Sequence, residues 1–390
     1  MPTQEISKSR ADANGQAPVF NFGIEEEYFL VHRDTRDLVQ KEQPHLMSAL
    51  KAALGDQVAN EFLCSQIEIS TPVCHSAHQA RSELARLRRT VIELAGEHRL
   101  SVVAASTHPF ARWSEQSVAD QPRYHDIARD LADVGSRLNT CGMHVHVGIE
   151  DKETRITVMN RVRTFLPLLL ALSSSSPFWQ GRNTGLKCFR LAVTDAQPRS
   201  GLPEAFANWA DYESTIALLC RSGAIDDASK IWWDIRPSSR FPTIEMRITD
   251  VCPRLDDAVT IASLFVCICR MLWRTRSTGG DAHPLLLLNE NRWRAQRYGI
   301  AGELIDPDRQ KLMSCCVLMQ ELLAEIAQDG EAQGCTAEIN RVSALLADGT
   351  SADRQIATYD RARQSGFSDA DALKAVVDLL VTETKYGLND

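Results

Sequence analysis

Residues 141–149, Cys-Gly-Met-His-Val-His-Val-Gly-Ile, alternate strictly between apolar side chains and small or polar ones. Successive side chains of a strand point to opposite faces, so Met143 and Val145 would share one face and His144 and His146 the other. This division is typical of an antiparallel sheet that is covered on one side only. The two glycines on the polar face leave room for a ligand beside the imidazoles. The stretch therefore predicts an antiparallel sheet with one open face that binds something.

Three other segments, far apart in the sequence, repeat the pattern with charged residues on the polar face: Glu25 and Glu27, Glu68, and Glu245 with Arg247. Two like charges on a partly buried face call for a proton or a cation between them, and a divalent metal is the usual answer. We expect an α+β fold in which helices cover the apolar face of a mainly antiparallel sheet. Acids and imidazoles would then line an open, acidic concave face that holds divalent cations.

Each of these segments also has a simpler interpretation. The acidic run Glu25-Glu26-Glu27 could be a solvated edge strand, and His144 and His146 could be ordinary strand histidines. Glu68 could be a charge at a strand edge, and Glu245 with Arg247 could form a local salt bridge. The recurrence of the pattern on four separate strands favours a common site.

The rest of the chain divides into helices, strands and loops. Residues 1–18 are polar and lack periodicity, so we expect a disordered leader followed by a single catalytic domain over 19–390 that is helical towards its C-terminus. We expect helices over 46–54, after a Ser76 cap, over 124–134, over 154–172 with Pro167 inside, and from Leu255 onward with breaks at Gly279-Gly280 and 299–307. Further strands are expected over 61–70, 101–106, 231–236 and 243–249. Residues 173–190 form a loop of a length that is uncommon unless it binds a ligand.

Charge and cysteine content exclude several classes of protein. The chain has 390 residues and a net charge of -8, which argues against a nucleic-acid backbone as partner. Its 11 cysteines include no CxxC pair, and no secretory signal precedes them, so we expect reduced thiols in the cytoplasm. The apolar stretch 258–273 is short for a membrane span and contains Arg270, which favours a buried helix and no membrane partner. Neither a Walker A nor a GxGxxG motif occurs, so metals and arginines would have to hold the phosphates of any nucleotide.

Taken as an ordered set, five short motifs resemble a known family. They are Gly-Ile-Glu-Glu-Glu-Tyr (23–28), Gln-Ile-Glu (66–68), Gly-Met-His-Val-His (142–146), Pro-Phe-Trp-Gln-Gly-Arg-Asn-Thr-Gly (177–185) and Ile-Glu-Met-Arg (244–247). The set is similar to the bacterial carboxylate–amine ligases of the glutamate–cysteine ligase type 2 family, from about Phe20 to Tyr386. The same patterns resemble glutamine synthetase. This likeness implies a curved antiparallel sheet with divalent cations on acidic strands and ATP at one end.

The resemblance also implies roles for individual residues. The metal ligands would be Glu25, Glu27, Glu68, His144 and Glu245. Arg247 would act on the transferring phosphate, with His146 beside ATP or the reacting carboxylate and Arg236 as a further anion-binding arginine. The cofactor would also contact Arg182, Thr184, Arg190 and Arg240. The chain departs from the family pattern at Cys188, where a serine is expected.

The predicted function is an ATP- and Mg²⁺-dependent ligase, with Mn²⁺ as an alternative metal. It would join a carboxylate, such as that of glutamate, to an amine, such as cysteine, through an acyl phosphate. Metals and an arginine suit that reaction, because it needs charge neutralisation more than a nucleophilic side chain. One alternative is a zinc-dependent amide hydrolase using His144 and His146, although no HExxH motif is present. Another is a protein that binds ATP or a metabolite without turnover. Small-molecule substrates are the expected partners, together with a second copy of the chain in a homodimer.

Overall fold

A computed structural model describes residues 19–277 and 283–388. The predicted leader 1–18 and the predicted break at Gly279-Gly280 lie outside the described residues. The main sheet has seven strands: β1 (Phe22–His32), β2 (Val58–Asn60), β3 (Gln66–Ser70), β4 (Leu100–Val103), β5 (Met143–Gly148), β10 (Ile235–Pro237) and β11 (Thr243–Met246). Three smaller pairs are β6 (Phe178–Trp179) with β7 (Arg182–Asn183), β8 (Ser200–Gly201) with β9 (Trp232–Trp233), and β12 (Glu303–Asp306) with β13 (Lys311–Ser314).

The helices before residue 255 are α1 (Pro44–Leu54), α2 (Ala77–Glu97), α3 (Pro122–Leu131), α4 (Asp133–Ser136), α5 (Lys152–Val162), α6 (Leu166–Ser173), α7 (Arg190–Thr194) and α8 (Trp209–Arg221). Those that follow are α9 (Leu255–Arg274), α10 (Leu285–Tyr298), α11 (Cys315–Glu325), α12 (Ala327–Gln333), α13 (Thr336–Asn340), α14 (Val342–Asp348), α15 (Ser351–Gln364) and α16 (Asp369–Thr384). The predicted cap at Ser76 is confirmed, because its side chain accepts a hydrogen bond from the Gln79 amide at 3.1 Å.

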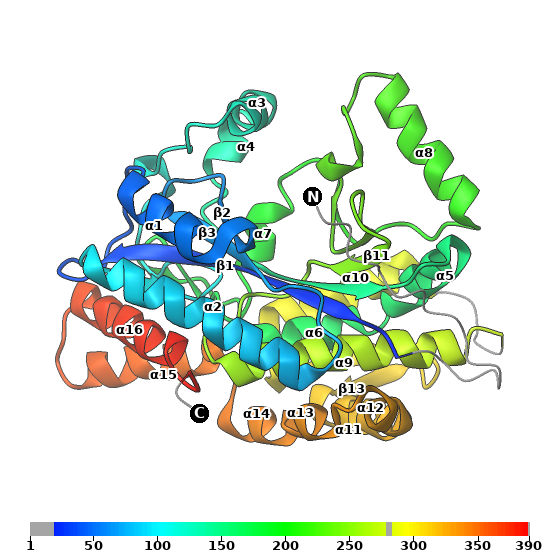
Figure 1. Cartoon of the computed structure of the whole chain (residues 1–390). Coiled ribbons are helices and arrows are strands. Elements are labelled where there is room, and N and C mark those ends of the chain that lie inside the picture. The colour runs from blue at the N-terminus through cyan, green and yellow to red at the C-terminus, as the bar shows by residue number, and fades with distance from the viewer. Residues whose placement is uncertain (1–18, 278–282, 389–390) are drawn as a thin grey trace.

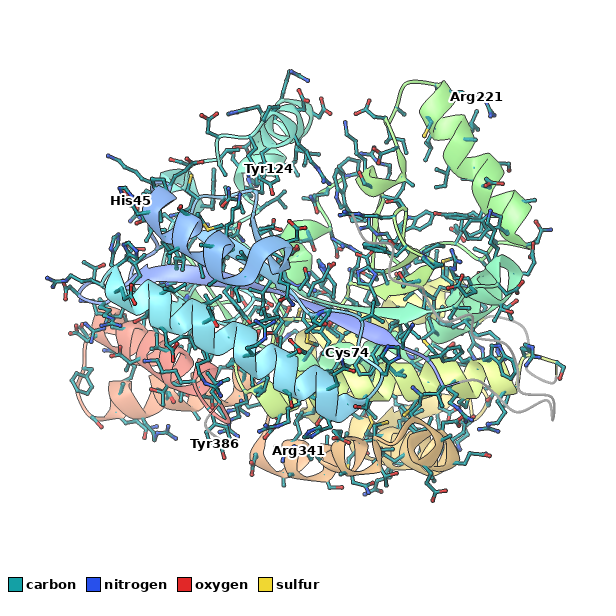
Figure 2. The ribbon with its side chains drawn as sticks, in the orientation of Figure 1. His45, Cys74, Tyr124, Arg221, Arg341 and Tyr386 are labelled. Atoms are coloured by element: carbon teal, nitrogen blue, oxygen red, sulfur yellow. The ribbon has the colours of Figure 1, made fainter. Side chains whose placement is uncertain are left out.

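The seven strands pair antiparallel in the order β10-β11-β5-β1-β3-β2, with β4 pairing along the other half of β1. The predicted antiparallel, open sheet is therefore confirmed. One layer of helices, including α2, α9 and the C-terminal helices, lies on one side of the sheet, while α3 and α8 project on the other (Figure 1). Tyr124 on α3 and Arg221 on α8 mark the two projecting helices, and Tyr386 and Arg341 mark the opposite side (Figure 2).

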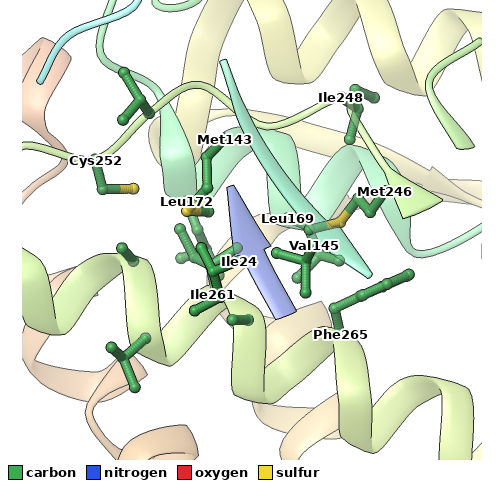
Figure 3. Close-up of a cluster of buried hydrophobic side chains, with 14 of the residues drawn as sticks. Ile24, Met143, Val145, Leu169, Leu172, Met246, Ile248, Cys252, Ile261 and Phe265 are labelled. Carbon is green, nitrogen blue, oxygen red and sulfur yellow. The ribbon is translucent and has the colours of Figure 1, made fainter. Parts of the chain in front are cut away.

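The apolar face of the sheet packs on α6 and α9. Ile24, Val145 and Met246 come from three neighbouring strands and are fully buried. They meet Leu169 of α6 and Phe265 of α9 (Figure 3). Nearly all of α9 is buried, which confirms the predicted buried helix over 258–273. Among residues 19–277 and 283–388, no helix is by itself long and apolar enough to cross a membrane; only α5 and α6 meet that criterion together, across a 65° bend.

Several local predictions need correction. The helix predicted over 124–134 is divided into α3 and α4, and the strand predicted over 231–236 is divided into β9 and β10. The strand predicted over 61–70 begins only at Gln66, because the chain reverses after β2 and β3 pairs back on it. The single helix predicted over 154–172 is divided into α5 and α6, with Pro167 in the first turn of α6, where its missing amide is tolerated. The region after Leu255 is not entirely helical, because the hairpin β12–β13 interrupts it.

Candidate metal and phosphate site

The polar side chains predicted from the four strands lie on the same side of the sheet because the strands are direct neighbours. In the register of β1 and β5, Glu25 is opposite His144, and in that of β1 and β3, Glu27 is opposite Glu68. In the register of β11 and β5, Glu245 is opposite His146. Glu26 points to the other face as predicted, where it is fully buried. There Arg88 of α2 binds it through two nitrogens, at 2.5 and 2.8 Å.

Glu27, Glu61 and Glu68 form a group of three carboxylates whose oxygens lie within 4.8 Å of one another. Burial raises the pKa of Glu27 and of Glu61, and the negative charge of Glu61 raises that of Glu27 further. Burial and the charges of Glu61, Glu25 and Glu27 raise the pKa of Glu68 well above its ordinary value. Without a cation, the mutual repulsion and burial of these carboxylates therefore favour their protonated forms.

Glu25 connects this group to the two histidines. The Glu25 carboxylate lies 3.3 Å from His144 Nδ1 and 3.4 Å from His146 Nε2. Burial opposes the ionisation of Glu25, but both imidazoles outweigh it, so the pKa of Glu25 lies well below its ordinary value. Burial and the nearby Arg247 lower the pKa of His144. Two further groups of three potential ligands result, Glu25 with His146 and Glu245, and Glu25 with Glu68 and His144.

The donor atoms fit divalent cations that prefer oxygen. Glu27, Glu61 and Glu68 offer only carboxylates, as Mg²⁺ and Mn²⁺ favour. His146 Nδ1 is hydrogen-bonded to Thr243 Oγ1 at 2.9 Å. The buried Nε2 faces Glu25 at 3.4 Å and has no hydrogen-bond partner among the described residues. An orphaned buried nitrogen beside a carboxylate is the arrangement that a bound cation would complete.

Glu245 is shared between two arginines. Arg236 donates to both of its carboxylate oxygens, at 2.8 and 3.1 Å, and Arg247 donates to one of them. Burial opposes the ionisation of Glu245, but Arg247 and Arg236 outweigh it, so its pKa lies well below the ordinary value. The local salt bridge between Glu245 and Arg247, which the sequence left as an alternative, is therefore present. Glu245 also lies close enough to Glu25 and His146 to share a metal ion with them. Two guanidinium groups and one carboxylate leave one positive charge at this end of the site.

The sequence profile of the Glutamate-cysteine ligase family 2 (GCS2) matches residues 21–377. The chain belongs to this family. A relative from Rhodospirillum rubrum, described as "Putative glutamate--cysteine ligase 2", is 48% identical over 373 residues, which are 94% of this chain and 96% of the relative. A relative of the same description from Paracoccus denitrificans is 43% identical over 376 residues, which are 96% of this chain and 100% of the relative.

Two solved structures share the fold. Glutamate–cysteine ligase of Francisella tularensis, in complex with AMP, matches with a TM-score of 0.70 and 14% identity over 96% of this chain and 90% of that one. A bifunctional glutathione synthetase of Pasteurella multocida matches with a TM-score of 0.68 and 13% identity over 95% of this chain and 54% of that one. The resemblance drawn from the motifs to the glutamate–cysteine ligase type 2 family is confirmed, and so are the predicted α+β fold with its antiparallel sheet and the enzyme class, an ATP-dependent ligase.

The arginines and the threonine predicted to bind the cofactor lie in different environments. Arg190 is buried, donates to Asp250 at 3.0 Å and holds the backbone carbonyls of residues 247–249. Arg240 lies over the ring of Phe241, which in turn meets the edge of His146. Arg182 is exposed on β7. Nearby, the Thr184 hydroxyl donates to the Pro177 carbonyl at 2.9 Å.

The predicted binding loop 173–190 is largely buried, and its exposed part is confined to residues 180–185. Cys188, where this family was expected to carry a serine, is fully buried. Its thiol donates to Asp250 Oδ1 at 3.0 Å, as a serine hydroxyl could. The side chain at position 188 therefore helps to hold the loop in place through its hydrogen bond to Asp250.

The sequence did not identify Glu61 as a candidate ligand. In an unbroken strand over 61–70, Glu61 and Glu68 are seven residues apart and would point to opposite faces. The chain reversal between β2 and β3 brings them together instead. A glutamate directly before the turn residues 62–65 was the only local signal. Arg292 of α10 is also buried, and its guanidinium group pairs with the carboxylates of Asp195 and Asp234.

Proposed function

We propose that this protein is an ATP- and Mg²⁺-dependent ligase that forms an amide between the carboxylate of an amino acid and an amine through an acyl phosphate. The observation that carries the proposal is the group of carboxylates on β1, β3 and the β2–β3 turn, next to Arg236 on β10 and Arg247 directly after β11. Oxygen ligands for cations and arginines for phosphate on one face are what phosphoryl transfer needs. Glutamate and cysteine are the first substrates to test, because the relatives are named for them.

The protein side chains would position and neutralise charge. A carboxylate resists direct attack by an amine because its oxygen is a poor leaving group, and ATP with its cations supplies a phosphate that leaves well. Glu27, Glu61 and Glu68 would hold one cation, and Glu25 with His146 and Glu245 another. Arg247, oriented by Glu245, would neutralise the charge that develops on the transferring phosphoryl group.

A zinc amide hydrolase is the second candidate, and the donor atoms do not favour it. Within residues 19–277 and 283–388, each potential metal group contains at most one imidazole, together with two or more carboxylates. Zinc in hydrolases is held mainly by nitrogen and sulfur. A binding protein without turnover would use the same side chains, and only a measurement of activity separates it from the ligase.

The test is a screen for ADP release with Mg²⁺ over pairs of amino-acid carboxylates and amines, with mass spectrometry to identify the amide. We expect one pair to give equal amounts of ADP, phosphate and amide. Arg247→Lys should lose most of the rate and serves as the control for a contaminating ATPase. Stoichiometric zinc retained after dialysis, without ADP release for any pair, would contradict the proposal. ATP binding by calorimetry without ADP release would indicate the binding protein instead.

A further inference from the structure

A small cavity of about 50 Å³ opens beside His144 and Arg247, on the side of the site towards β8 and β9. Its far wall includes Trp232, Asp234 and Asp195. A single water needs roughly 10–15 Å³, so the cavity has room for a small polar group of a substrate. It adjoins the place where Arg247 would hold the transferring phosphate. A group bound there would be next to the reacting atoms.

The far wall of the cavity carries excess negative charge. Arg292, from α10, donates to both oxygens of Asp195 at 2.7 Å, and to the two oxygens of Asp234 at 2.6 and 3.2 Å. Two carboxylates and one guanidinium leave one negative charge on this wall. The near wall, which includes Arg190 and Arg247, has the opposite sign. Arg190 is paired with Asp250, whereas Arg247 shares the carboxylate of Glu245 with Arg236, which leaves one positive charge behind this wall.

The two walls are rigidly connected. The Asp234 carbonyl accepts hydrogen bonds from the amides of Arg247 at 2.8 Å and Ile248 at 3.1 Å. The Asp234 side chain is buried and fixed by Arg292, so the negative wall keeps its position relative to Arg247. Preorganised charge of this kind favours a ligand with a matching separation of charge.

A second, larger cavity gives room for the rest of such a ligand. It has a volume of about 550 Å³ and shares Trp232 with the small cavity. The Arg199 guanidinium stacks on the Trp232 ring at 5.3 Å. Residues 198–201 therefore contribute to both cavities, and a substrate could extend past Trp232 from one towards the other.

We propose that the small cavity binds the ammonium group of an amino-acid substrate, with Asp195 and Asp234 on the ammonium and Arg247 towards the reacting end. The proposal rests on the proposed ligase function and specifies its substrates as amino acids whose ammonium group is recognised. Both substrates, the carboxylate donor and the attacking amine, offer such a group, and the experiment distinguishes the two.

The test is calorimetric binding to the full chain with Mg²⁺ and a non-hydrolysable ATP analogue. One pair of probes is L-glutamate and glutarate, and the other is L-cysteine and 3-mercaptopropionate; the second member of each pair lacks the amino group. The wild type should bind the amino-bearing member of one pair at least about tenfold more tightly, as expected for a charged hydrogen bond. Asp195→Asn should remove most of that preference.

Asp256→Asn is the matched control. Asp256 is partly buried and paired with arginines like Asp195, but its partners are Arg81 and Arg341. This control should retain the wild-type preference. Loss of preference in the glutamate pair assigns the ammonium to the donor, and loss in the cysteine pair assigns it to the attacking amine.

Equal binding of both members of each pair by the wild type, or no binding of any probe, overturns the proposal whether or not a variant folds. A preference that survives Asp195→Asn in a protein with a normal melting curve overturns it as well. Binding and ADP release are separate readouts, so the two proposals can fail independently. If the wild type prefers the amino-bearing probe but releases no ADP, the cavity assignment stands and the ligase proposal is contradicted. If the wild type releases ADP but Asp195→Asn keeps the preference, the ligase proposal stands and the cavity assignment is contradicted.

Discussion

Replacing Glu61 by glutamine should stabilise the metal-free protein and weaken its response to Mg²⁺. Glutamine keeps the size of the side chain and can still accept the hydrogen bond from the Phe62 amide, which is 3.1 Å long. It removes one of three negative charges whose oxygens lie within 4.8 Å. At that separation and an effective dielectric constant of about 20, each pair of full charges repels by roughly 3.5 kcal/mol.

The measured gain should be smaller than this repulsion, because the carboxylates avoid full charge by retaining protons. The pKa values of Glu27, Glu61 and Glu68 are all raised in the folded protein. We therefore expect a gain of about 1–2 kcal/mol in the free energy of unfolding near pH 8. For a chain of this length that corresponds to a rise of roughly 1–3 °C in melting temperature.

The gain should depend on pH in a definite direction. Below the ordinary glutamate pKa of about 4.5, the carboxylates are protonated in both folded and unfolded chains, so Glu61→Gln and the wild type should be equally stable. As the pH rises through the raised pKa values, the wild type loses the stability that its retained protons provided. The difference between variant and wild type should therefore grow from pH 5 to pH 8.

Thermal melts in EDTA at pH 5, 6.5 and 8, and then with increasing Mg²⁺, test this reasoning. The wild type should gain stability with Mg²⁺ according to the binding equilibrium, and Glu61→Gln should need at least about tenfold more Mg²⁺ for the same gain. Glu303→Gln, on an exposed position of β12, is the matched control and should follow the wild type. A Glu61→Gln variant that is less stable than the wild type in EDTA at every pH, or that responds equally to Mg²⁺, would refute the role of the three carboxylates.

Other predictions concern the phosphate arginine, the core and the exposed loop. Glu245→Gln should raise the Mg²⁺ concentration needed for activity, whereas Arg247→Lys should lower the maximal rate at an unchanged Mg²⁺ requirement; near-normal rates in both would leave only a structural salt bridge. Glu26→Gln should lower the free energy of unfolding by about 3–5 kcal/mol in urea melts, because Arg88 stays buried without its partner; a loss below about 1 kcal/mol would contradict this. Limited proteolysis should cut within residues 180–185, more slowly with Mg²⁺ and ATP, and unchanged rates would argue against ordering of this turn by ligand. Protein freed of metal by EDTA should regain ADP release with Mg²⁺ or Mn²⁺, while recovery with Zn²⁺ alone would favour the hydrolase.

The sequence by itself determined which side chains share a face of each strand. Alternation with a period of two is a local property, so Glu25 and Glu27 separate from Glu26 whatever the rest of the chain does. The helix cap at Ser76 is equally local, since it joins residues three positions apart. Four such strands, with a resemblance over nearly the whole chain, were enough to predict the sheet and most of the side chains that meet in the candidate metal site.

The tertiary structure decided which of these groups meet and what else joins them. Glu61 reaches Glu68 only because the chain reverses between β2 and β3, and a strand pattern cannot show where such a reversal falls. Arg292 lies 97 positions from Asp195 and 58 from Asp234, yet one guanidinium holds both carboxylates. Contacts over such distances follow from the order of the strands and the position of α10 in the fold. Local periodicity predicts neither the order of the strands nor the position of α10, because it shows to which face a side chain points and not which residue it contacts.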